Sequence, residues 1–78
     1  MEATKHAVFL APINVIEAAT ERAGLESVIN EFTIGGESIF ILSQTVDITA
    51  VSGDTHAIMR LIGAFADDGM DCLVRCSV

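Results

Sequence analysis

The chain has 78 residues, which suffices for one domain and leaves no room for a linker and a second core. Eleven acidic residues stand against four basic ones, and 51% of the residues are hydrophobic. Binding to nucleic acid or to an anionic membrane needs a basic surface, so this charge balance argues against both. One interpretation of the acidic residues is that they keep a hydrophobic domain soluble. The alternative interpretation is that they form an acidic face for a basic partner.

The N-terminus and the cysteines predict a cytoplasmic protein. Glu2 stands where a secretory signal needs basic charge, and no cleavage pattern follows it. No apolar run approaches the roughly 18 residues that span a membrane. Cys72 and Cys76 lie on one expected strand, too far apart for a disulfide or a shared metal ion. We therefore expect reduced thiols in the core.

The N-terminal third predicts a strand followed by a helix. The apolar run His6–Ala11 is typical of a central strand covered on both faces. Asn14, followed three residues later by Glu17, matches a capping box, and the helix should run to about Ala23. Gly24 fits a left-handed helix stop. The residues expected to face the sheet are Val15, Ile16, Ala19 and Ala23.

Two runs rich in β-branched residues, joined by Gly35–Gly36, predict a hairpin at the centre of the chain. Such residues suit a pleated surface, and adjacent glycines supply the positive φ angles of a tight turn. Residues 27–34 should form the first strand, although Leu25, Val28, Ile29 and Phe32 also have helical spacing, which leaves an extension of the first helix open.

The second run, residues 38–51, is too long for one typical strand, and its apolar parity reverses midway. A flat strand would turn its apolar face over at that point. We therefore expect a bulge, or a turn between two strands, near Ser43–Thr45. A short helix over residues 37–43 is the less favoured alternative.

The last third predicts a second helix and a final strand. Ser52–Gly53–Asp54 ends the strand pattern, and Asp54 should cap a helix from Thr55 to about Asp68. Gly69 ends this helix, and residues 70–78 alternate as a strand does. The apolar face of the helix consists of Ala57, Ile58, Leu61, Ile62 and Phe65.

This order predicts a single α+β domain over residues 1–78: a ferredoxin-like β-α-β-β-α-β sandwich with an extra short strand or turn allowed near Ser43–Thr45. Two helices would cover one face of a mainly antiparallel sheet. The other face stays open, and an open face or an unpaired edge in so hydrophobic a chain predicts a homodimer. Residues that add apolar surface for it are Val28, Ile29, Phe40, Leu42 and Leu73.

No catalytic, cofactor or metal pattern stands out, so we expect a protein that is not an enzyme. His6 and His56 lack a neighbouring nucleophile or carboxylate arranged as a triad. Gly35–Gly36 is not followed by the helix start of a phosphate loop.

The candidate partner-binding residues are Asp67, Asp68 and Asp71. They lie at the expected C-terminal end of the second helix, where the helix dipole is already negative and no basic residue of the last turn offsets them. Residues whose placement opposes local stability are more often functional than the average surface residue. Simple solvation of the helix end is the alternative interpretation.

We therefore expect a small acidic interaction module that binds and modulates another protein, for example a phage or accessory-type inhibitor of a basic, nucleic-acid-binding target. The element order and the stretch FADDGMDCLVR resemble small regulatory domains of the ACT type. This resemblance implies, as the alternative function, a small ligand bound between subunits. The ligand-site motif of that family is not found, so the resemblance assigns no site residues.

Overall fold

The computed structural model describes residues 4–77, without the side chains of Asp71, Cys76 and Ser77. Along the chain the elements are β1 (Thr4–Phe9), α1 (Ile13–Thr20), η1 (Glu21–Ala23), β2 (Glu26–Val28), β3 (Glu31–Ile34), β4 (Glu37–Gln44), β5 (Thr49–Asp54), α2 (Thr55–Asp67), η2 (Asp71–Leu73) and β6 (Val74–Ser77).

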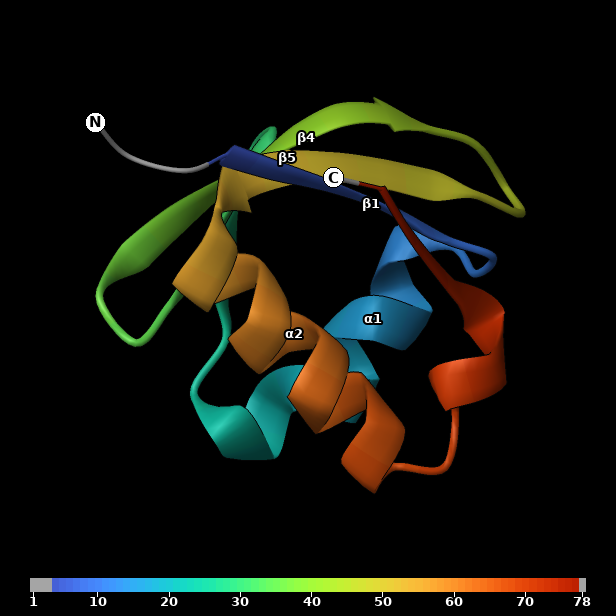
Figure 1. Ribbon diagram of the computed structural model, residues 1–78. Coiled ribbons are helices and arrows are strands. Elements are labelled where there is room, and N and C mark those ends of the chain that lie inside the picture. Colours follow the sequence, from blue (N-terminus) through green and yellow to red (C-terminus); the bar gives the residue numbers. More distant parts are fainter. Residues whose placement is uncertain (1–3, 78) are drawn as a thin grey trace.

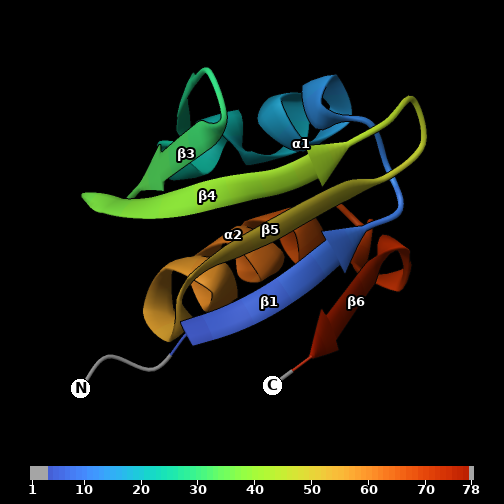
Figure 2. The same ribbon diagram turned by 90° about the horizontal axis from the view of Figure 1, so that it is seen from above.

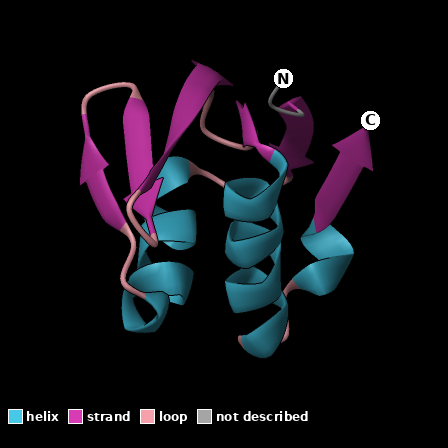
Figure 3. Cartoon of the chain, turned by 60° about the vertical axis from the view of Figure 1, so that its left-hand side comes forward, coloured by secondary structure: helices cyan, strands magenta, loops and turns pink. Residues whose placement is uncertain are grey.

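The strands form one sheet of six, in the order β2-β3-β4-β5-β1-β6, and every neighbouring pair is antiparallel. Helices α1 and α2 lie side by side beneath one face of this sheet (Figures 1 and 3). Figure 2 looks onto the opposite face, with the helices behind the strands. The predicted α+β class, with two helices on an antiparallel sheet, is confirmed. Four strands, rather than two, separate the helices in the chain.

The core lies between the sheet and the two helices. Phe9 of β1 and Phe65 of α2 meet edge to face, with ring centroids 5.0 Å apart. The predicted apolar face of α2 is confirmed, because its residues are buried except Ile62, which is half-buried. The largest other apolar side chains that are fully buried are Phe32, Ile16, Ile34, Ile39, Ile58, Leu61 and Val51.

The diglycine hairpin forms as predicted, and a second hairpin precedes it. Gly35 and Gly36 have φ angles of 60° and 81°, which join β3 to β4. Asn30 has a φ of 64° in the turn between β2 and β3, a conformation that asparagine adopts more readily than most residues. Residues 27–34 are therefore two short strands, and the alternative of a longer first helix is wrong.

The parity reversal in residues 38–51 is resolved by a bulge and a turn together. The register between β4 and β5 shifts between Ile41 and Ser43. The turn follows at residues 45–48, where the Thr45 side chain accepts hydrogen bonds from the backbone N–H groups of Asp47 and Ile48. The predicted bulge or turn is confirmed, and the short helix is wrong.

The predicted capping box of the first helix is wrong. Pro12 holds the N-cap position in an extended conformation without a side-chain cap, and Asn14 is exposed inside the helix. Because proline presets its own φ, the chain enters the helix two residues earlier than Asn14. Glu17 instead accepts a hydrogen bond from Ser27. Gly24 is left-handed as expected, whereas Ala23 is exposed and does not face the sheet.

Three strand predictions need correction. β1 has strands on both sides, but only alternate residues such as Ala7 and Phe9 are buried, because helices cover one face alone. β5 continues through Gly53 to Asp54 instead of ending before them. The alternating C-terminal run is extended only from Val74, because η2 first leads the chain from the helix layer back to the sheet. Its predicted last residue, Val78, lies outside the described residues.

Candidate protein-interaction site

The acidic corner is the C-terminal end of α2 with the predicted residues Asp67, Asp68 and Asp71. Asp67 is the last helical residue and Asp68 caps the helix, and both are exposed. Gly69, with a φ of 81°, then reverses the chain so that η2 begins at Asp71. The structure thus brings the backbones of all three residues to one end of the helix layer, while the Asp71 side chain lies outside the described part.

A basic residue distant in sequence contacts this corner. Arg22 of η1 forms an ion pair with Asp68, in which Nη2 lies 2.7 Å from Oδ1. The Arg22 side chain is 81% exposed, so the pair is worth at most about 1 kcal/mol. Within the described residues, no hydrogen bond or ion pair involves the Asp67 side chain. The helix end is therefore partly neutralised at Asp68 and left negative at Asp67.

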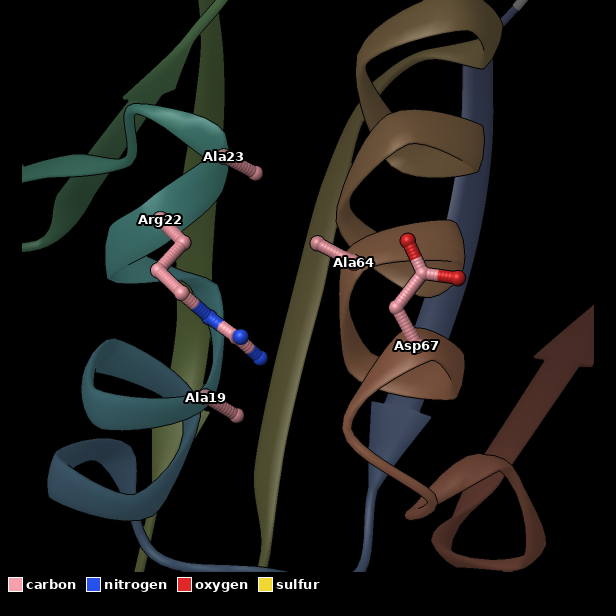
Figure 4. Close-up of a pocket in the computed structure, with 5 residues that line it drawn as sticks. All are labelled: Ala19, Arg22, Ala23, Ala64 and Asp67. Atoms are coloured by element: carbon pink, nitrogen blue, oxygen red, sulfur yellow. The ribbon is translucent and has the colours of Figure 1, made fainter.

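A groove of about 300 Å³ separates the two helices beside the corner, and Figure 4 shows its lining. Ala19 and Ala23 face Ala64 across it, and these short side chains leave the space unfilled. Arg22 extends from η1 toward α2, and Asp67 stands on the opposite wall (Figure 4). A second hollow of about 300 Å³ shares part of this lining and adds Ile34, Arg60 and Gly63. The groove therefore carries both signs of charge.

The sequence did not indicate this groove, although it contained a signal for it. Small residues recur four positions apart in the first helical segment, and Gly63–Ala64 lies on the second helix opposite them. Such spacing aligns small side chains on one helix face. The partner of Asp68 had no comparable signal, because Arg22 lies 46 residues away in the chain.

The cysteine and histidine side chains that the structure describes do not gather into a reaction centre. Within the described residues, no group of three or more His, Cys, Asp or Glu could hold a metal ion. Cys72 is a free and exposed thiol, so its predicted place in the core is wrong, and the Cys76 side chain lies outside the described part. His6 lies on β1, and His56 in the first turn of α2.

The apolar residues expected to support self-association divide into two groups. Val28, Ile29, Phe40 and Leu42 are exposed, as that prediction requires. Leu73 is half-buried and packs against the core from η2, so it does not add to the open surface. No helix in the described part of the chain is long and apolar enough to span a membrane.

Comparisons of the chain with protein-family models, with curated proteins and with solved structures find no match.

Proposed function

We propose that this chain is a small acidic module, without enzymatic activity, that binds and modulates a basic protein in the manner of a phage or accessory-type inhibitor. One observation carries the proposal. Asp67 and Asp68 are exposed at a helix C-terminus that disfavours negative charge, and only Asp68 is paired with a described residue. With Asp71, they would form an acidic rim that attracts a basic partner and speeds its association.

The architecture supports a binding role for the sheet as well. We assign a ferredoxin-like core to α1, α2 and the four strands ordered β4-β5-β1-β6, with the hairpin of β2 and β3 added at one edge. This arrangement leaves one sheet face without helices (Figure 2). The proposal includes a cytoplasmic location and a homodimer joined at a sheet edge.

The acidic corner is tested by exchanging Asp67 and Asp68 for asparagine. The immobilised wild-type protein first captures its partner from a lysate, and a stoichiometric, salt-sensitive partner is then purified. We expect D67N/D68N to bind that partner about 3- to 10-fold more slowly at low salt, because charges at the rim of an interface steer the encounter. The free energy of unfolding should change by less than about 0.5 kcal/mol, because relief at the helix end offsets the lost exposed ion pair.

Glu21→Gln is the control, since it removes one exposed acid from η1, outside the acidic corner. It is compared with the single variant Asp67→Asn. If D67N/D68N associates at the wild-type rate in low salt, the corner is not the contact surface. An equal slowing by Glu21→Gln would assign the effect to net charge alone.

The alternative function, an ACT-like regulatory domain that binds a small ligand, is favoured by the groove between the helices. Arg22 and Asp67 would hold groups of opposite charge on one small molecule. A ligand that binds there must raise the melting temperature. Thermal scans against a metabolite panel test this, with Ala64→Leu as the variant that fills the groove. Stabilisation in the wild type that Ala64→Leu abolishes would favour this function over protein binding.

A further inference from the structure

Most of the exposed large apolar side chains in the described residues lie in one segment of the chain. Six of the eight fall between residues 28 and 48, and the other two are Leu10 and Met59. The six are Val28, Ile29, Phe40, Leu42, Val46 and Ile48. Exposed apolar side chains that gather on one face mark an interaction site more often than scattered residues do.

The strand register places part of this set on the open face. Val28 pairs with Glu31, and Glu31 pairs with Phe40, so the three side chains form one row across β2, β3 and β4. Their neighbours Phe32 and Ile39 are buried against the helices, which fixes the row on the opposite face. Figure 2 looks onto this face. We name Glu26, Val28, Glu31, Phe40 and Leu42 the β2–β4 surface.

The charged side chains of the chain segment that forms this surface are all acidic. Residues 23–55 contain five acids and no lysine, arginine or histidine. Glu26 shares the open face with Val28, since successive residues of a strand alternate between faces. Ser38 donates a hydrogen bond of 2.7 Å to Glu31, which holds that carboxylate beside Phe40. Apolar and acidic side chains therefore alternate over the surface.

We propose that the β2–β4 surface docks a basic amphipathic segment of another protein, in which lysine or arginine alternates with apolar residues. Such a segment would set its apolar side chains on Phe40 and Val28 and its cations on Glu26 and Glu31. This inference rests on the proposed function, because it names where the basic partner is held. The acidic corner then speeds association by attracting the basic partner, and the β2–β4 surface supplies the desolvated contact that holds it.

A second copy of the chain fits this surface less well. Two copies meeting through it would place Glu26 and Glu31 against the same acids, and facing like charges are destabilising. The basic side chains of the open face, His6 and Arg75, lie on β1 and β6, across the sheet from this surface. The Arg75 guanidinium already donates to the carbonyl groups of Cys72 and Val74.

The test uses two labelled synthetic peptides of equal charge, one alternating lysine with leucine and the other alternating lysine with serine. Binding is measured by fluorescence anisotropy on the full chain. We expect Phe40→Thr to weaken binding of the lysine–leucine peptide at least about fivefold, because the central apolar contact is lost. Threonine suits a strand, and a circular-dichroism melt confirms the fold of the variant. Glu31→Gln should weaken binding of both peptides.

Met59→Gln is the matched control, since Met59 on α2 is 52% exposed and Phe40 is 55% exposed. It should bind the lysine–leucine peptide within about twofold of the wild type, since Met59 lies outside the proposed contact. Amide chemical-shift changes on the wild type should cluster in residues 26–42.

Four outcomes would overturn the inference. If Phe40→Thr binds the lysine–leucine peptide as tightly as the wild type does, the β2–β4 surface is not the docking site. The proposed binding of a basic partner would then still stand. Equal affinity of the wild type for the two peptides would show that charge alone drives binding and that the apolar contact with Phe40 and Val28 contributes nothing. A dimer that Phe40→Thr dissociates would assign the surface to a second copy. If neither peptide binds the wild type, the basic partner of the proposed function fails too.

Discussion

Gly53 shows how a single missing side chain shapes the sheet. A Cβ atom at this position would lie 3.0 Å from the Ser38 carbonyl oxygen and 3.2 Å from the Ile39 Cα, both in the neighbouring strand. Only glycine lets β4 and β5 approach so closely without a shift of the backbone. The sequence pattern marked Gly53 as the end of a strand, because glycine at a turn and glycine at a close approach look identical in sequence.

Gly53→Ala should therefore lower the free energy of unfolding by about 1–3 kcal/mol, as overpacking does. Gly63→Ala is the opposite case, because an added Cβ in α2 meets nothing within 4 Å. It should raise stability by about 0.5–1 kcal/mol, since alanine favours a helix over glycine. Urea unfolding measures both. A Gly53→Ala variant as stable as the wild type would contradict the close approach between the strands.

At the level of single residues, the candidate site was only partly predictable from the sequence. Asp67, Asp68 and Asp71 stood out because their charge opposes a helix end that local periodicity located correctly. The ion pair between Arg22 and Asp68 depends on how two helices pack, and no local pattern contains that information. The row of Val28, Glu31 and Phe40 on the open face likewise needed the register of three strands.

The elements were predictable where one local signal dominated. The diglycine hairpin and α2 followed from turn chemistry and helical periodicity. The hairpin of β2 and β3 was missed because Ile29 in its turn suits a strand, and a lone Asn30 was too weak a turn signal between two apolar runs. The predicted C-terminal alternation extended too far into η2. It placed Met70 and Cys72 on one face, but the 3-10 turn brings Met70 and Leu73, three residues apart, against the core and leaves Cys72 exposed.

The two helices differ in their N-terminal caps, and the effect of the caps on the free energy of unfolding can be measured. The Asp54 side chain caps α2 by accepting a 2.9 Å hydrogen bond from the His56 N–H, whereas α1 has no side-chain cap. Asp54→Ala should cost about 1 kcal/mol of unfolding free energy. Asn14→Ala should leave stability unchanged or raise it by a few tenths of a kcal/mol, because alanine is the better helix former. Comparable losses in both variants would restore the capping role of Asn14 that the sequence suggested.

Across the whole molecule, charge and apolar surface are arranged by face. The acids of β2 and β3 accompany exposed apolar residues on the open sheet face, while the acidic corner lies in the helix layer. A partner that reaches both must wrap around the edge at β2 or use two segments. A bivalent contact of this kind raises the overall affinity without any new contact at either surface, because the second contact forms within a complex that already exists. D67N/D68N and Phe40→Thr should then act on different rate constants, association for the first and dissociation for the second.

The final prediction is the homodimer. In the described part of the chain, β2 pairs only with β3 and β6 only with β1, so each presents a row of unpaired backbone groups at a sheet edge. A second copy satisfies such a row most simply through a two-fold contact. Analytical ultracentrifugation at micromolar concentration should show a species of twice the 8.3 kDa chain mass. An edge contact predicts that this species persists in Phe40→Thr, because that side chain projects from the sheet face. A species of 8.3 kDa that persists as the protein is concentrated would rule the dimer out.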